Sequence, residues 1–258
     1  MLGPSLHILF LYILNTLAAG AHAALKRRNA RFRDHGDERR RSIASVFAII
    51  TGKTALFVLA FPVLRAIVLA HETWSPALVA CAHLCAQVLM VTYLFDMTYR
   101  HVNAILWVHH TLTLSACLFF LHVTGPSAPG PARLWLTVPM LFLGLGVGLT
   151  DLGGDVAVLT YYLAPPSAGA AYVIRMCARY LMLGRATQWV LVLSVLFRGE
   201  WHALGLGNAA VGIMGVVLLT WGAAELEEIY AILGMSQKLR LRTLANAGRT
   251  ENGAEPKS

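Results

Sequence analysis

Two adjacent histidines, His109 and His110, lie within an apolar stretch and have the clearest capacity for chemistry in this sequence. Histidine can act as a general base, a nucleophile or a proton carrier near neutral pH. Its second ring nitrogen then needs an orienting partner, which is commonly a carboxylate. Because adjacent residues of a helix point about 100° apart, we expect one histidine to face the site and the other to face a neighbouring helix.

Asp155 is the carboxylate predicted for this role, because it lies at a similar depth in its own apolar run. Asp151 lies one turn away on the same face, so the predicted catalytic group is the two histidines and these two aspartates. Ionisable residues inside apolar runs are costly unless they face a partner, water or the interior of a bundle. Four more such residues are predicted to bind substrate: Lys53, Arg179, Arg185 and Glu225.

The depths of these groups agree with one another. Counted from the predicted cytoplasmic helix ends, all of them except Arg185, which is not placed this way, lie about 11 to 18 Å into the membrane. We therefore predict a polar cavity within a helix bundle, opening toward the cytoplasm.

The same residues also allow a purely structural interpretation. The two aspartates would then neutralise Arg179 and Arg185, and the histidines would bridge carbonyl groups of neighbouring helices. Asp96 and Arg100 are four residues apart at a helix end, which predicts a surface ion pair. Among the three acidic residues near the end of the last apolar run, solvation is expected to account for at least two.

The elements that must position these groups are membrane helices. The chain has 258 residues, of which 57% are hydrophobic and 13% are charged. Its apolar residues form runs of about twenty, the length that spans a bilayer as a helix. We therefore predict an all-α polytopic membrane protein with about seven spans, at residues 4–25, 43–69, 76–97, 102–124, 134–163, 171–197 and 203–233.

Basic residues predict the orientation, because short basic loops stay on the cytoplasmic side. Lys and Arg gather at residues 26–41 and after residue 238, whereas the loops at 71–75, 125–133 and 198–202 carry few. The predicted order is a first span with its N-terminus outside or lumenal (1–25), a basic cytoplasmic loop (26–42), a six-helix domain (43–239) and a disordered cytoplasmic tail (240–258).

The small residues before Leu25 also allow a cleaved signal peptide, but the basic residues directly behind the first apolar run favour an anchor. The net charge of +8 sits mostly in the two basic segments. It therefore predicts attraction to anionic lipid rather than nucleic-acid binding.

Metal binding is not predicted, because HExxH and histidines four apart are absent from the sequence. Cysteines inside the predicted helices are expected to pack rather than to form disulfides or hold zinc. They are Cys81, Cys85, Cys117 and Cys177.

The segment YLFDMTYRHVNAILWVHHTLTLSACLFF, residues 93–120, joins an aromatic and acidic stretch to an apolar helix that contains His-His. It resembles the signature helix of the TLC-domain family, which includes the ceramide synthases. The segment LTDLGGDVAVL, residues 149–159, resembles the acidic pair of that family. It differs in that three residues separate Asp151 from Asp155, where the ceramide synthases have two. The likeness covers residues 43–239.

The resemblance implies a bundle of about six spans preceded by one more, in the membrane of the endoplasmic reticulum. It also implies a role in lipid and sphingolipid metabolism, with the histidines in an acyl-transfer cavity. The first hypothesis is therefore an acyltransferase that uses acyl-CoA as co-substrate and no bound cofactor, with Lys53 or Arg179 attracting the phosphates of the donor. The second is a non-enzymatic lipid-binding or lipid-homeostasis protein. A receptor or transporter has less support, and the oligomeric state is left open.

Overall fold

The computed structural model describes residues 4–70, 75–100, 104–123, 139–197 and 208–252, and no β-strand occurs among them. The expected all-α class is therefore confirmed for this part of the chain. The elements are α1 (Pro4–Arg28), α2 (Ala30–Arg33), α3 (Asp37–Arg65), η1 (Ala66–Ala70), α4 (Pro76–Tyr99), α5 (Ala104–Val123), η2 (Leu141–Thr150), α7 (Leu152–Leu163), α8 (Ala168–Phe197) and α9 (Asn208–Asn252), of which η1 and η2 are π-helices.

Four helical segments are long and apolar enough to cross a membrane: Ser5–Arg28, Asp37–Val68, Pro76–Tyr99 and Leu141–Leu163. They correspond to four of the seven predicted spans, and α5, α8 and α9 lie at the other three. Large apolar side chains are exposed on many of these helices, for example Ile8, Leu183 and Val190. An outer surface of this kind is compatible with contact with lipid.

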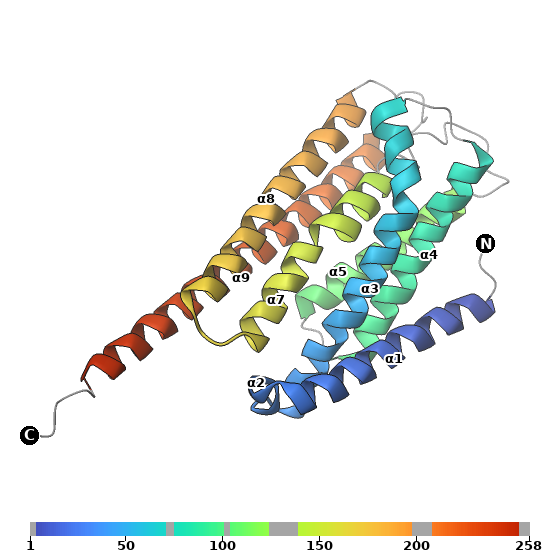
Figure 1. Cartoon of the computed structure of the whole chain (residues 1–258). Helices are drawn as coiled ribbons and strands as arrows, with labels where there is room; N and C mark the ends of the chain where they lie inside the picture. Colours follow the sequence, from blue (N-terminus) through green and yellow to red (C-terminus); the bar gives the residue numbers. More distant parts are fainter. Residues whose placement is uncertain (1–3, 71–74, 101–103, 124–138, 198–207, 253–258) are drawn as a thin grey trace, which may run out of the picture.

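The helices form one elongated bundle (Figure 1). Helix α3 packs against α4, α1 and η2, while α8 packs against α9 and α7. Helix α1 crosses the side of the bundle obliquely, in contact with α3 and α4 (Figure 1). The short connection between α7 and α8 brings these two helices side by side and antiparallel. Asp151, at the start of α7, can therefore pair with Arg185 of α8.

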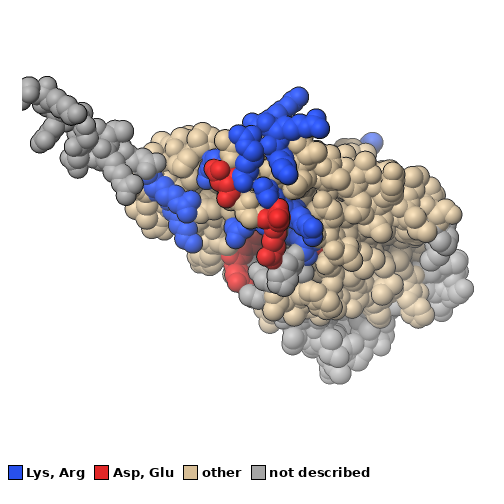
Figure 2. Space-filling view, turned by 90° about the horizontal axis from the view of Figure 1, so that it is seen from below, with Lys and Arg blue, Asp and Glu red and all other residues tan. Residues whose placement is uncertain are grey.

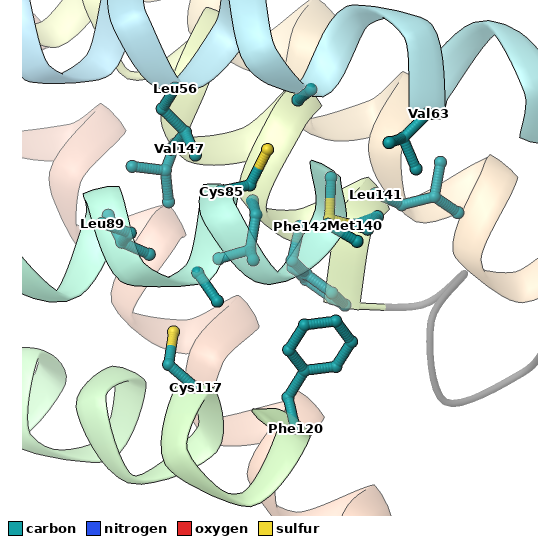
Figure 3. Packing of buried hydrophobic residues seen from close by; sticks show 14 of the residues in the cluster. Leu56, Val63, Cys85, Leu89, Cys117, Phe120, Met140, Leu141, Phe142 and Val147 are labelled. Carbon is teal, nitrogen blue, oxygen red and sulfur yellow. The ribbon is translucent and has the colours of Figure 1, made fainter. Parts of the chain in front are cut away.

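The largest apolar core joins α3, α4, α5 and η2 (Figure 3). Leu56 of α3 lies near Val147 of η2 and Leu89 of α4 there, and Val63 of α3 lies beside Leu141 of η2 (Figure 3). Cys85 and Cys117 are buried in the same core, and all four cysteines are free, as expected for packing residues. This core holds together the helices that carry the histidines and one of the buried cations.

The basic segment is more helical than the prediction of a loop implied. Helix α1 continues to Arg28, α2 follows with Asn29 as its N-cap, and α3 begins at Asp37. Asp37 and Glu38 in the first turn of α3 favour this early start, because carboxylates stabilise a helix N-terminus. Lys and Arg side chains gather on this end of the molecule, and Asp and Glu side chains lie among them (Figure 2).

Helix α9 also departs from expectation, because it continues to Asn252 and so includes most of the segment 240–258 that was expected to be disordered. It projects beyond the bundle (Figure 1). Lys238, Leu239 and Arg240 are good helix formers, and Leu239 is fully buried, so the helix has local and packing reasons to continue. Residues 253–258 and most of the loops at 71–75, 125–133 and 198–202 lie outside the described residues.

Candidate functional site

Arg185 is the centre of a buried network of charges between α7, α8 and α9. It forms an ion pair with Asp151, and its Nη1 lies 2.8 Å from Oε1 of Glu225. Its Nη2 also lies 3.8 Å from Oε2 of Glu228, whose side chain is partly exposed. Arg185, Asp151 and Glu225 are all buried. The guanidinium thus compensates carboxylates from two neighbouring helices.

Lys53 extends this network to α3. Its Nζ donates to Oδ2 of Asp155 over 2.7 Å and lies 3.9 Å from Oδ2 of Asp151. Asp151 therefore stands between the two buried cations, Lys53 and Arg185. Both predicted aspartates are neutralised, as the structural interpretation requires, but Lys53 takes the place that this interpretation gave to Arg179.

Two polar side chains of α8 complete the coordination of Glu225. Trp189 Nε1 donates to Oε2 of Glu225 over 2.9 Å, and Gln188 Nε2 donates to Oε1 over 3.4 Å. Arg185 in turn donates to Oε1 of Gln188 over 3.1 Å. Glu225 is therefore fully coordinated, which is the usual condition for a buried carboxylate. We name the set Lys53, Asp151, Asp155, Arg185, Gln188, Glu225 and Glu228 the Arg185 network.

The π-helix η2 positions Asp151 within the Arg185 network. The amide of Asp151 donates to the carbonyl of Gly146, five residues earlier, and not to the residue four before it. Gly146 also leaves room for the network, because a Cβ there would lie 2.7 Å from Gln188 Oε1 and 2.8 Å from Arg185 Nη1. Segments of π-helix occur often at functional sites.

His110 forms a separate buried pair with Asp96 of α4. Its Nε2 lies 2.9 Å from Oδ2 of Asp96, which also accepts from Nη2 of Arg100 over 2.7 Å. Because an ionised carboxylate only accepts hydrogen bonds, Nε2 is the donor in this contact, and Nδ1 has the lone pair in the neutral form of the imidazole. Nδ1 is buried and has no hydrogen-bond partner among the described residues. The pair is therefore an imidazole held by a carboxylate, with an unused basic nitrogen.

Tyr93 fixes the plane of the His110 ring. The two ring centroids are 4.1 Å apart, and Tyr93 lies one turn before Asp96 on the same face of α4. One face of α4 therefore supplies both the partner and the support of His110. We name the pair of His110 and Asp96 the His110 dyad, and Arg100 and Tyr93 are its supporting residues.

His109 lies between the His110 dyad and the Arg185 network. It is half-buried, and its ring meets the edge of Trp221 on α9 at a centroid distance of 5.4 Å. Its ring centroid lies 5.6 Å from that of His110. Trp221 contacts Phe142, which contacts Trp189 beside Glu225. The two polar groups are thus connected through His109 and an aromatic layer.

The structure brings most of the predicted residues together, with two corrections of role. His110 is oriented by Asp96 and not by Asp155, which is occupied by Lys53. Asp96 is 2% exposed, so its pairing with Arg100 is not the surface pair that was predicted. The spacing of four residues between Asp96 and Arg100 already explained the charge of Asp96, and nothing in the sequence indicated His110 as its partner.

Arg179 is the predicted site residue that lies elsewhere. Its side chain is exposed on the outer face of α8, and it is separated from Arg185 by about 120° around the helix axis. The participants that the sequence interpretation missed are Tyr93, Gln188, Trp189 and Glu228. Glu228 is one of the three acidic residues near the end of the last apolar run, of which at least two were expected to be solvated. Only its spacing of three residues from Glu225 could have indicated a shared face.

No group of three or more His, Cys, Asp or Glu side chains placed to hold a metal ion occurs among the described residues. The arrangement offers an imidazole nitrogen without a hydrogen-bond partner among the described residues, next to a layer of paired charges. A comparison of the whole chain with protein families, with curated proteins and with solved structures finds no match.

Proposed function

We propose that this chain is a multi-pass membrane protein of TLC type, with seven spans, that transfers an acyl group from acyl-CoA to a lipid amine. The observation that carries the proposal is the His110 dyad. A carboxylate holds Nε2–H of the imidazole, and the opposite nitrogen is buried and unpaired within the described residues. This orientation is one requirement of a general base, and the reaction further requires the substrate to reach Nδ1 when it binds. The family likeness and residence in the endoplasmic reticulum belong to the same proposal.

In the proposed reaction His110 moves one proton. As the neutral amine attacks the thioester carbonyl, Nδ1 takes a proton from the amine nitrogen, and Asp96 stabilises the imidazolium that forms. When the tetrahedral intermediate collapses, the imidazolium returns the proton to the CoA thiolate. The products are one amide and one free thiol. His109 lies beside this path and, with Trp221, would position the reacting groups.

An amine is favoured as the acceptor by the charge of the Arg185 network. This network contains four carboxylates, Asp151, Asp155, Glu225 and Glu228, against the two cations Lys53 and Arg185. Its neutrality therefore requires protons on carboxylates or a further cation. Of the carboxylates paired with Arg185, Glu228 has the longest distance to it and the most exposed side chain. It is therefore the carboxylate best placed to receive the amine as an ammonium group and to take its first proton, which leaves the neutral amine for the reaction.

A non-enzymatic lipid-binding function is the second candidate, and one observation favours it. Asp151 and Asp155, which the first hypothesis used to orient the histidines, are held by Arg185 and Lys53. In this second function the network would hold a lipid headgroup and His109 would contact it. It predicts a lipid that co-purifies with the protein and no release of CoA.

The test of the proposal is amide formation by the purified protein. The protein in mild detergent is incubated with long-chain acyl-CoA and a long-chain amino alcohol, and the amide is measured by mass spectrometry. His110→Gln is the decisive variant, because glutamine can donate to Asp96 but has no basic nitrogen. We expect it to lower the rate about 100-fold or more, while the variant remains folded.

His122→Ala is the matched control, since His122 is an exposed histidine at the end of the same helix. It should leave the rate unchanged. Amide formation by His110→Gln at the wild-type rate would reject the catalytic role of His110. Absence of amide with the wild-type protein, together with a tightly bound lipid, would establish the binding function instead.

A further inference from the structure

The outer face of α8 carries two arginines for which the bundle provides no anion. Arg175 and Arg179 are both exposed, and they lie one turn apart. Among the described residues Arg175 makes no hydrogen bond or ion pair, and Arg179 reaches only Sδ of Met176, at 3.9 Å. This contrasts with Arg185 of the same helix, which faces inward and is surrounded by carboxylates.

The surface around these two arginines is apolar. Tyr172, Leu183 and Val190 are exposed by 61%, 71% and 66%, and they share the outward side of α8 with Arg175 and Arg179. In the proposed seven-span arrangement this side of α8 faces lipid. A guanidinium on a lipid-facing surface is costly unless it reaches an anion or the headgroup layer. The pair of arginines therefore requires an anionic partner from outside the bundle.

The position of the arginines along α8 shows which layer they reach. Helix α8 begins at the basic end of the molecule, because Leu163 at the end of α7 accepts a hydrogen bond from Asn29 in the basic segment, over 3.2 Å. Arg175 and Arg179 lie about 10 Å and 16 Å along α8 from its start. Helical side chains lean toward the N-terminus, so both guanidiniums extend back toward the basic end.

We infer that Arg175 and Arg179 form a binding site for the phosphate of one anionic phospholipid in the leaflet at the basic end of the molecule. The two guanidiniums supply positive charge on successive turns, and phosphate is the anion that arginine binds most effectively. The exposed apolar side chains that flank them accommodate the acyl chains. Tyr172 lies at the headgroup level, where tyrosine is enriched in membrane proteins. The inference rests on the seven-span arrangement and not on the proposed reaction.

The test is a comparison of two double variants that remove equal charge. Arg175→Gln/Arg179→Gln removes the site, whereas Arg27→Gln/Arg28→Gln removes two exposed arginines at the end of α1. Each protein in a neutral detergent is titrated with dioleoyl phosphatidylglycerol and with dioleoyl phosphatidylcholine, and binding is followed by native mass spectrometry. For the wild-type protein we expect one phosphatidylglycerol molecule to bind more tightly than the rest.

Arg175→Gln/Arg179→Gln should weaken this first phosphatidylglycerol about tenfold or more, and Arg27→Gln/Arg28→Gln should weaken it much less. Equal weakening by both variants would mean that only diffuse charge attracts the lipid, and would overturn the site. No weakening by either variant would also overturn it. A wild-type dimer that Arg175→Gln/Arg179→Gln dissociates would overturn the lipid assignment, because the anion would then come from a second copy. Amide formation by the variants reports separately on the proposed reaction.

Discussion

The Arg185 network and the His110 dyad are both buried in the same bundle, but they differ in the kind of atom that is left without a partner among the described residues: Nε of a guanidinium in the network and Nδ1 of an imidazole in the dyad. In the network, each carboxylate has a cation within 4 Å, and Gln188 and Trp189 add further hydrogen bonds to Glu225. In the dyad, His110 is held on one side by Asp96 and leaves Nδ1 without a partner among the described residues.

This difference indicates different roles. A network of paired charges stabilises the arrangement of its helices only while it is intact, because removal of one cation leaves its carboxylates buried and unpaired. An imidazole with one oriented and one unused nitrogen can move a proton without breaking the pair that holds it. We therefore expect changes in the network to act mainly on stability, and changes in the dyad to act mainly on activity.

The largest effect on stability is expected for Arg185→Met. This change leaves Asp151 and Glu225 buried without their main cation, which should lower the free energy of unfolding by about 3–5 kcal/mol. The measurement is equilibrium unfolding in mixed detergent. Arg179→Met on the outer face of the same helix is the control and should cost less than about 1 kcal/mol. Similar losses for both variants would contradict the assignment of the two faces of α8.

Lys53→Met is expected to cost about 3 kcal/mol, because Asp155 loses its partner at 2.7 Å. Addition of Asp155→Leu should recover most of this loss, since a buried ion pair can be replaced by apolar side chains of similar size. The free energies of the two single variants and the double variant form a mutant cycle. A double variant with the summed loss of the single ones would mean that the two side chains are not coupled.

Asp96→Asn should affect activity more than stability. We expect about 1–3 kcal/mol of destabilisation from the weakened contact with Arg100, and about a 100-fold or larger fall in amide formation, because the imidazole loses its carboxylate. Thermal unfolding and the amide assay are measured on the same sample. Asp37→Asn, which changes an exposed aspartate paired with Arg40, is the control. Full activity of Asp96→Asn would remove the dyad from the reaction.

The smallest effects are expected at glycines. Gly146→Ala places a methyl group against Arg185 and Gln188 and should cost about 1–2 kcal/mol. Gly234 in α9 has nothing within 4 Å of a built Cβ, so Gly234→Ala should stabilise the helix by about 0.5–1 kcal/mol. Thermal melting of both variants in detergent gives the sign of each change. Stabilisation by Gly146→Ala as well would show that the network tolerates the added methyl group.

The sequence predicted the helical class and most of the Arg185 network, for a physical reason. Charges within apolar runs are too costly to remain alone, so Lys53, Asp151, Asp155 and Arg185 were expected to meet other polar groups. Arg179 was assigned to the site wrongly, because the sequence predicted its depth in the membrane but not the face of α8 on which its side chain lies. Both faces of α8 contain apolar residues, so amphipathicity did not distinguish the inner face from the outer one.

The His110 dyad could not be predicted in its observed form. Asp96 comes 14 residues before His110 and on another helix, and a partner four residues away already explained its charge. The π-helix before Asp151 is equally hidden, since its hydrogen-bond pattern depends on packing against α3 and α8. Only the glycines at positions 144, 146 and 148 mark the place where neighbouring helices approach closely.

The most direct test of the account is the release of CoA thiol from long-chain acyl-CoA, with and without a long-chain amine, by wild-type protein and by His110→Gln at equal folded concentration. The account predicts amine-dependent release by the wild-type protein. For the variant it predicts a rate that is lower by about 100-fold or more. Amine-dependent release at equal rates by both proteins would contradict the role of His110, and no release by the folded wild-type protein would contradict acyl transfer itself.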